Sequence, residues 1–334
     1  MARQSGEPRL AEQLYERALA IQSAAAHRRL EGVALGSLAS LYQVTGQAAR
    51  AEHTYEQALA ILRAAGNRRS EGSALGNLAG LYQETGRVEL AERTYNQALA
   101  VHREGGNRRS EGVTLGDLAG LYDETGRVEQ AQLTYDRALA IHREVGNRQF
   151  EGMALGNSAI LSFNAGQVEL AERTFEQALA IHREVANRRS EGIVLGNLAS
   201  LYKKAGRVQK AEQTYEEALA IVREFGDRRI EGIALGNLAI LYRDAGQAEK
   251  ASRTFEQALA ILRTVGDRRS EGLFLCESAL LILARGRVDE ARKKWRLGAE
   301  ELRRLGSLEI EAKTRSMTEA CSKAGVCPFD EAAK

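Results

Sequence analysis

The chain has 334 residues, of which 44% are hydrophobic and only 5% aromatic, and its 47 basic and 45 acidic residues leave a net charge of +2. A nucleic-acid-binding protein would carry a large basic excess, so this balance argues against nucleic acid as a partner. Three cysteines are too few for a disulfide framework in a chain of this size. Residues 1–8 contain no apolar run, and no apolar stretch is long enough to cross a bilayer. We therefore expect a soluble, cytoplasmic protein.

A forty-residue period recurs along the chain without insertion or deletion. The segment at 67–72 returns at 107–112 and 187–192, and returns at 267–272 with aspartate in the first place. A period of this length indicates a solenoid, in which each unit packs only on its neighbours. Because a solenoid has no single deep cleft in its core, we expect its function to lie on one long surface.

The first predicted element is a helix centred on Tyr15, within an N-terminal segment of residues 1–30. It matches the second helix of the repeat but has no first helix before it. Its apolar face over residues 10–21 must therefore be covered. Either this helix frays or caps the end of the array, or the protein associates with itself through this face.

Each complete unit is predicted to be a pair of antiparallel helices, as residues 70–107 illustrate. Ser70 can cap the first helix, apolar residues then follow at helical spacing, and Gly86 can take the left-handed conformation after its end. The second helix runs to about Glu104. One such pair cannot bury both of its faces, so neighbouring pairs must stack.

The spacing of apolar and small residues in this unit resembles the tetratricopeptide repeat (TPR) pattern. The matching positions are Leu75, Leu78, Ala79, Tyr82, Gly86, Ala91, Tyr95 and Ala98. The usual TPR unit has about 34 residues, so the forty-residue unit is similar to the longer TPRs of kinesin light chain. The resemblance implies an all-α, right-handed superhelical solenoid of antiparallel helix pairs that binds protein partners.

The period divides the chain into three expected parts. Residues 1–30 form an N-terminal half repeat, residues 31–306 form seven units of forty residues, and residues 307–334 form a polar capping helix and a tail. The apolar tail at 326–329 either packs on the last repeat or serves as a docking motif. Two units depart from the consensus, which predicts either local repacking or a point where the array flexes. Their unusual residues are Ser158 and Ser162 in the fourth unit and Cys276, Glu277, Ser278 and Ile282 in the seventh.

In TPR arrays the first helices line a concave face, and here their sixth position carries a row of polar side chains. An amide at this position has both a donor and an acceptor, so it can hold the backbone of an extended peptide. The alternative is an asparagine that bonds within its own helix pair. The row that we expect to bind peptide is Asn77, Asp117, Asn157, Asn197 and Asn237.

Charged residues beside this row should give the groove its specificity. Acidic side chains in the second and third units would make its N-terminal half acidic. Three basic residues, Lys203, Lys204 and Arg243, would make it basic towards the centre and beyond. The opposite interpretation is a solvated face with chance charges. A glycine precedes the row in six units, from Gly36 to Gly236, which indicates close approach of either a neighbouring helix or a ligand, and we favour the neighbouring helix.

A second candidate surface is the ridge of arginine pairs between units. One arginine of each pair should bond a helix C-terminus or a neighbouring glutamate, while a row of the others could hold an acidic protein or anionic lipid. His102, His142 and His182 recur with the same period, and we interpret them as exposed helix positions, since metal ligands must converge on one ion. The arginine pairs begin at Arg28, Arg68, Arg108, Arg188, Arg228 and Arg268.

No catalytic motif, phosphate-binding loop or zinc-ligand spacing occurs in the sequence. We therefore predict a non-catalytic scaffold or adaptor without cofactor or metal. Its partner would be an extended peptide or a repetitive filament bound in the concave groove, and the likeness to kinesin light chain suggests a tubulin-like bacterial cytoskeleton. The alternatives are an adaptor that binds a membrane surface through the arginine ridge and a regulatory receptor for a signalling peptide.

Overall fold

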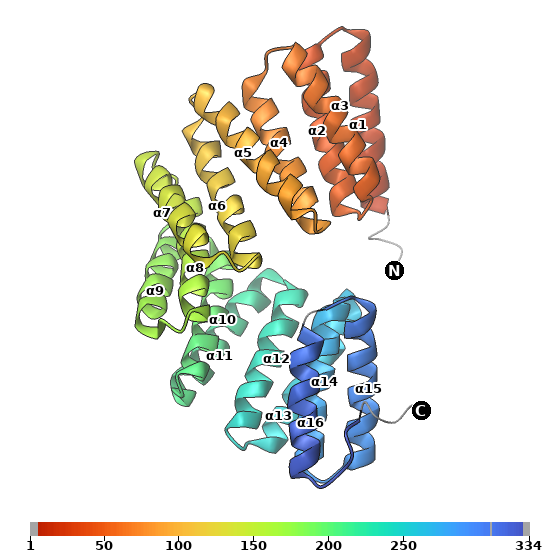
Figure 1. Ribbon diagram of the computed structural model, residues 1–334, viewed down its shortest axis with the longest axis vertical. Helices are drawn as coiled ribbons and strands as arrows, with labels where there is room; N and C mark the ends of the chain where they lie inside the picture. Colours follow the sequence, from red (N-terminus) through yellow and green to blue (C-terminus); the bar gives the residue numbers. More distant parts are fainter. Residues whose placement is uncertain (1–5, 308, 330–334) are drawn as a thin grey trace. The chain divides into compact units, whose positions relative to one another are not determined.

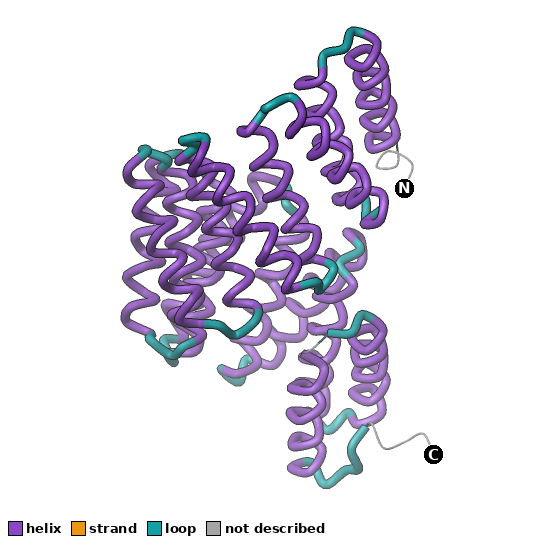
Figure 2. Tube along the Cα trace, turned by 45° about the horizontal axis from the view of Figure 1, so that its top comes forward, coloured by secondary structure: helices purple, strands orange, loops and turns teal. Residues whose placement is uncertain are grey.

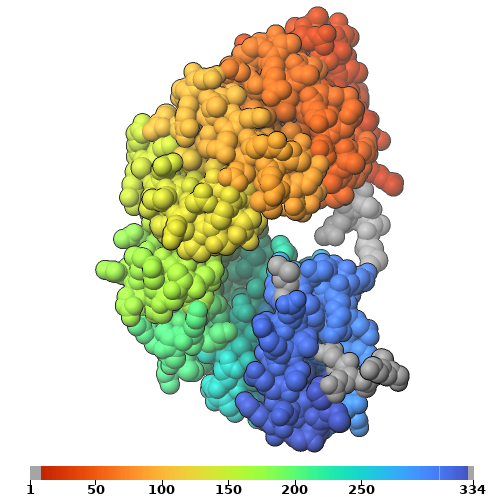
Figure 3. All heavy atoms as spheres, viewed as in Figure 1, coloured from red at the N-terminus to blue at the C-terminus, as the bar shows by residue number. Residues whose placement is uncertain are grey.

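The computed structural model of the chain describes residues 6–307 and 309–329. Residues 1–5, 308 and 330–334, which belong to the expected N-terminal half repeat and C-terminal tail, lie outside the described residues. The described residues form sixteen α-helices and no strand, as an all-α fold predicts (Figures 1 and 2). They group into two compact units, Met1–Ala165 and Gly166–Lys334 (Figure 3, red to yellow-green and yellow-green to blue).

The N-terminal unit holds the first eight helices and the C-terminal unit the other eight. Their bounds in the N-terminal unit are α1 (Gly6–Ala24), α2 (Arg28–Val44), α3 (Ala48–Ala64), α4 (Arg68–Glu84), α5 (Val88–Glu104), α6 (Arg108–Glu124), α7 (Val128–Glu144) and α8 (Arg148–Asn164). In the C-terminal unit they are α9 (Val168–Glu184), α10 (Arg188–Lys204), α11 (Val208–Phe225), α12 (Arg228–Asp244), α13 (Ala248–Val265), α14 (Arg268–Ala284), α15 (Val288–Arg304) and α16 (Glu309–Lys323).

The first helix of a repeat begins earlier than the sequence predicts. Before α4 the cap is Asn67, whose side chain accepts a hydrogen bond from the backbone N–H of Ser70 at 3.3 Å, so the prediction of Ser70 as the cap is wrong. An asparagine or aspartate oxygen satisfies a backbone donor of the first turn, as a serine would have done. At the other end, Gly86 has φ of 73°, the left-handed conformation predicted for it.

First helices lie on the inner side of each unit. A first helix packs against the second helix that follows it, as in α4 and α5 or α12 and α13. The backbones of successive first helices also approach one another closely, whereas successive second helices such as α9 and α11 meet through long side chains such as Arg183 and Glu217. Because the stack is tighter on the side of the first helices, that side is concave. We call it the inner face, formed by α2, α4, α6 and α8 in the N-terminal unit and by α10, α12 and α14 in the C-terminal unit.

From α4 to α14, a buried glutamate near the start of each first helix joins that helix to the second helix before it. Glu71 is 2% exposed and accepts hydrogen bonds from Nε of Arg63 and Nη1 of Arg68, both at 2.9 Å. Two arginines thus compensate one buried carboxylate. This arrangement confirms that one arginine of a pair bonds a neighbouring glutamate. It recurs at Glu111, Glu151, Glu191, Glu231 and Glu271.

The repeating histidines are buried, so the interpretation of them as exposed positions is wrong. His102, His142 and His182 are only 1–2% exposed. The imidazole of His102 fills the space that Gly72 leaves on the paired helix, where an added Cβ would collide with Cε1 of the ring. The same close approach joins His142 to Gly112. A glycine on one helix therefore makes room for an aromatic ring on the next.

Val326 and Phe329 of the apolar segment 326–329 pack against the last helices. Phe329 is buried in a cluster with Trp295 and Met317, and the guanidinium of Arg292 lies 5.2 Å from the centre of its ring. α16 contacts both α14 and α15. Among the described helices, none combines the length and apolar character needed to span a membrane.

Candidate functional site on the inner face

In the N-terminal unit the structure brings together three of the predicted row residues. Asn77, Asp117 and Asn157 lie on α4, α6 and α8, each exposed beside buried neighbours. Because these three helices touch in succession, their equivalent positions form a row across the inner face. The buried hydroxyl of Tyr55 lies under this row beside Asn77, and burial raises the pKa of that hydroxyl. The floor below the row is therefore polar as well.

The C-terminal unit brings together Asn197 and Asn237 on α10 and α12. Both are half-buried, and neither side chain forms a hydrogen bond with another residue in the described part of the chain. Their amides therefore keep donors and acceptors for an external partner. Lys203 lies on the same helix as Asn197, and Lys204 ends that helix at an exposed position.

Most of the glycines before the row have no packing role. A Cβ added at Gly36, Gly116 or Gly196 would meet no atom within 4 Å, and at Gly76 the nearest atom would lie 3.8 Å away. At Gly236, in contrast, a Cβ would collide with the ring of Phe274. The attribution to helix packing is therefore wrong at Gly36, Gly76, Gly116 and Gly196 and confirmed at Gly236. At Gly36, Gly116 and Gly196 the glycine lowers helix stability by about 1 kcal/mol against alanine, and no packing contact of the glycine offsets that loss.

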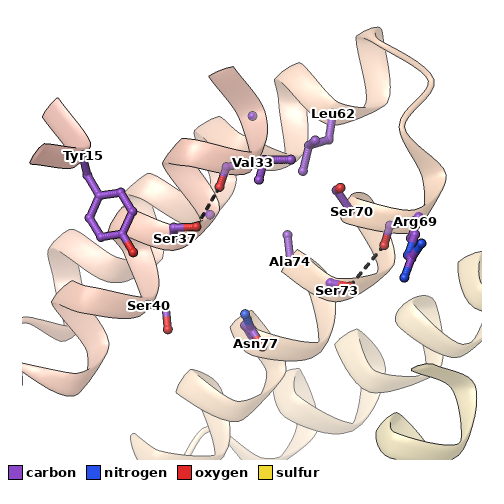
Figure 4. A pocket seen from close by; sticks show the side chains of 12 residues that line it. Tyr15, Val33, Ser37, Ser40, Leu62, Arg69, Ser70, Ser73, Ala74 and Asn77 are labelled. Atoms are coloured by element: carbon purple, nitrogen blue, oxygen red, sulfur yellow. Dashed lines mark hydrogen bonds between the residues drawn. The ribbon is translucent and has the colours of Figure 1, made fainter. Parts of the chain in front are cut away.

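A hollow in the inner face follows from these small residues. Between α2 and α4 lies a cavity of about 380 Å³ (Figure 4). The hydroxyl of Ser37 donates to the backbone oxygen of Val33 at 3.1 Å, and that of Ser73 donates to the backbone oxygen of Arg69 at 3.2 Å. Both hydroxyls can still accept hydrogen bonds from a ligand. The polar lining comprises Tyr15, Ser37, Ser40, Arg69, Ser70, Ser73 and Asn77.

Carboxylates without counter-charges gather towards the C-terminal ends of α4 and α6. Asp117 keeps contact with solvent but has protein on its other sides, and this desolvation raises the pKa of its carboxyl to about 6. Burial, and then the neighbouring Glu124, raise the pKa of Asp123. Nε2 of Gln83 donates to Glu124 at 2.7 Å. No described cation forms an ion pair with Glu84, Asp117, Asp123 or Glu124.

The second arginine of each pair behaves differently in the two units. In the C-terminal unit Nε of Arg229 donates to Asp267 at 2.8 Å, and Arg189 pairs in the same way with Asp227. In the N-terminal unit the equivalent arginines are exposed and make no ion pair with a described residue. The cause is the residue that caps the first helix one repeat later. It is an asparagine after each unpaired arginine, whereas Asp227 and Asp267 follow Arg189 and Arg229. The unpaired arginines are Arg29, Arg69 and Arg109.

Arg243 lies on the inner face, but its guanidinium already forms an ion pair with Glu277 of the same chain. Its Nη1 and Nζ of Lys313 donate to the two carboxylate oxygens of Glu277, which stands in the row position of the seventh repeat. Burial would raise the pKa of Glu277, but these two cations outweigh it and lower that pKa. Lys203 makes no ion pair with a described residue, and burial lowers its pKa. Of these two predicted cations, Lys203 is thus the available one.

Comparison with known proteins connects this architecture to a family. The sequence pattern described as tetratricopeptide repeat matches residues 70–144, 150–224 and 190–264, more than half of the chain. No curated protein matches the chain in sequence.

Similar solved structures share the fold at low sequence identity. BtubC (BKLC) from P. vanneervenii is 23% identical with a TM-score of 0.58, and the match covers 66% of this chain and 92% of that one. The Rap conjugation regulator of plasmid pLS20, solved with the Phr* peptide, is 16% identical with a TM-score of 0.63, covering 89% and 78%. A putative kinesin light chain from Podospora anserina is 24% identical with a TM-score of 0.48, covering 57% and 95%.

Proposed function

Because the chain belongs to the tetratricopeptide repeat family, we propose that it is a scaffold whose inner face binds an extended segment of a partner protein. The observation that carries this proposal is the row of glycines beside the row of amides. Gly36, Gly116 and Gly196 weaken their helices without any packing gain. They do leave room for a second backbone to approach the helix surface.

The amides provide the chemistry for such a backbone. An extended peptide presents N–H and C=O groups that no helix or sheet of its own satisfies, and these groups need partners when they leave water. Asn197 and Asn237 offer one donor group and one acceptor each at a spacing of one repeat. Binding through the backbone is tolerant of sequence, so the charged residues nearby would select the partner.

A receptor for a signalling peptide is the form of this function with additional support. The Rap regulator, which shares the fold with a TM-score of 0.63, was solved in complex with the Phr* peptide. A short peptide needs a preformed surface, because it brings little area of its own to offset the entropy lost on binding. A tubulin-like filament stays a prediction from the kinesin-light-chain resemblance.

The test uses a random peptide library selected on the full chain, followed by fluorescence anisotropy with the enriched peptide. Two double variants, Asn77→Ala with Asn157→Ala and Asn197→Ala with Asn237→Ala, remove the amides of one unit each. We expect at least one of them to weaken binding ten-fold or more, a loss of about 1.4 kcal/mol. Gly116→Ala should weaken a peptide bound to the N-terminal unit without unfolding it, because the added methyl group enters open space.

The matched control is Asn96→Ala. Asn96 is an exposed asparagine on the second helix α5, and its amide donates to the backbone oxygen of Glu92. It should leave the affinity unchanged. Equal affinity for all these variants would remove the inner face as the binding site, and so would a selection that enriches no peptide.

A further inference from the structure

The inner face of the N-terminal unit carries opposite charges on its two edges. One stripe of α4 carries four polar residues at helical spacing: Arg69, Ser73, Asn77 and Glu84. The cavity lining places Arg69, Ser73 and Asn77 on one surface (Figure 4). The first turns of the helices thus contribute an arginine edge of Arg29, Arg69 and Arg109, and the last turns contribute an acidic edge of Glu84, Asp123 and Glu124.

Charges on these edges differ from most others of the unit in having no ionic partner. Away from the inner face, Arg87 pairs with Glu52 at 2.8 Å and Arg127 with Glu92 at 2.7 Å. No residue of either edge forms an ion pair in the described part of the chain. Unpaired charges of opposite sign that face one groove favour a ligand with a complementary charge pattern.

The width between the edges suits one extended strand. Arg69 and Glu84 lie 15 positions apart, which is about 22 Å along a helix. An arginine facing a glutamate of the ligand, or a glutamate facing a lysine of the ligand, spans about 10 Å between Cα atoms by bond lengths. One pair on each side of a central strand therefore nearly fills the width. Successive side chains of an extended strand point in opposite directions.

We infer that the inner face of the N-terminal unit binds an extended peptide segment in which acidic and basic side chains alternate. The acidic side chains face Arg29, Arg69 and Arg109, and the basic ones face Glu84, Asp123 and Glu124. This inference rests on the proposed function, because it requires the peptide backbone to lie along the inner face. From the sequence we expected the charge of the groove to change along its length, from acidic to basic. In this unit the charge changes across the width of the groove instead, from the arginine edge to the acidic edge.

The structure also limits the length of the segment. On α8 the edge positions are Gln149 and Asn164, so both edges lose their charge there. Neighbouring helices pack with axes about 8–10 Å apart, so the two steps from α2 to α6 correspond to about six extended residues. An anionic membrane or a nucleic acid would meet the acidic edge as well as the arginines, and that edge would repel it.

The experiment compares two labelled eight-residue peptides of identical composition. One alternates glutamate and lysine, and the other has four glutamates followed by four lysines. Their net charges are equal, and eight residues are too few for a stable helix, so a difference in affinity reports the charge pattern. For the full chain at low ionic strength we expect the alternating peptide to bind at least five-fold more tightly.

Variants then assign the preference to the two edges. The first double variant is Arg69→Gln with Arg109→Gln, which copies Gln149 of the fourth repeat. The second is Glu84→Gln with Glu124→Gln. Each should abolish the preference for the alternating peptide. Arg137→Gln changes an exposed, unpaired arginine on α7 and should leave it intact. Circular dichroism checks that each variant is folded.

Two outcomes separate this inference from the proposed function. If the two peptides bind equally while the library peptide still depends on the asparagines, the inference is wrong and the proposed function stands. If no peptide depends on any residue of the inner face, both are wrong. A preference that survives both pairs of edge variants would also overturn the inference.

Discussion

His102 and His142 are buried imidazoles between paired helices of the N-terminal unit. Burial lowers the pKa of both side chains, although the carboxylates of Glu111 and Glu151 act in the opposite direction. In the unfolded chain each imidazole takes up its proton near the ordinary value of 6.5. The folded state resists that proton, so acid favours unfolding. Above pH 6.5 both states are neutral, and the histidines contribute no pH dependence.

We predict that replacing both histidines with leucine removes part of the acid sensitivity. Leu62, Leu262 and Leu302 occupy the equivalent position in other repeats, each opposite a glycine, so leucine fits the site. The free energy of unfolding of the native protein should fall as the pH drops below 6.5, while that of His102→Leu with His142→Leu should fall less. Urea denaturation at pH 7.5, 6.5 and 5.5 measures the difference. Parallel pH profiles for the two proteins would contradict the assignment.

Two glycines four residues apart on α6 should respond in opposite ways to the same change. A Cβ at Gly112 would lie 2.7 Å from Cε1 of His142 and 3.1 Å from a methyl carbon of Ile141, whereas a Cβ at Gly116 would meet nothing within 4 Å. We predict that Gly112→Ala destabilises the protein by about 1–3 kcal/mol through overpacking. Gly116→Ala should stabilise it by about 0.5–1 kcal/mol, because alanine is the better helix former.

Chemical denaturation of both alanine variants measures these changes in the free energy of unfolding. The native protein is the common reference, and each variant controls for the general effect of a methyl group on α6. A stabilising Gly112→Ala would show that the imidazole moves aside easily. A destabilising Gly116→Ala would show that this glycine has a packing role after all.

At the scale of helices, the buried glutamate is the repeated link between one second helix and the following first helix. Glu191 accepts from Nε of Arg183 at 2.8 Å and from Nη1 of Arg188 at 2.6 Å. Burial would raise the pKa of Glu191, but the two guanidinium groups outweigh burial and lower it. Arg183 also contacts Glu217, whose side chain is half exposed. One arginine therefore joins a buried carboxylate and an exposed one.

We predict that Glu191→Gln destabilises the protein by about 2–3 kcal/mol, below the cost of breaking a fully buried pair because both arginines stay half exposed. The control Glu217→Gln removes an exposed carboxylate from the same arginine and should change the free energy of unfolding by less than about 0.5 kcal/mol. Urea denaturation at pH 7 compares the two. Equal effects would mean that burial of Glu191 does not decide its contribution.

The helix pairs could be predicted from the sequence because their signals are local. Gly86 ends a helix, and the apolar residues of one repeat lie within a few turns of one another. The surroundings of His102 are not local, since they depend on Gly72 thirty positions earlier. The pairing of Arg69 depends on residue 107, and only the difference between Asn107 and Asp227 could have revealed which arginines stay unpaired. The candidate site therefore needed the structure, although each residue of its row was visible beforehand.

At the scale of the whole molecule, the two ends of the array are finished differently. On α1, Leu10, Leu14 and Ile21 are 57%, 56% and 64% exposed. On α16, Met317 and Cys321 are buried, and the tail at Phe329 closes over the same cluster. A repeat array gains its stability from contacts between neighbours, so a terminal helix with few buried contacts opens most easily.

We predict that the amides of α1 exchange with deuterium much faster than those of α5, and that α16 lies between them because Lys313 bonds Glu277 on α14. Hydrogen–deuterium exchange with mass spectrometry measures this order. Protection of α1 equal to that of α5 in dilute protein would contradict it.

Repeating the measurement at a hundred-fold higher concentration tests self-association. A second copy bound to the exposed apolar residues of α1 would slow exchange in α1 as the concentration rises. Fraying of α1 by itself is independent of concentration. Slower exchange at the higher concentration would make the exposed face of α1 a second binding surface beside the inner face.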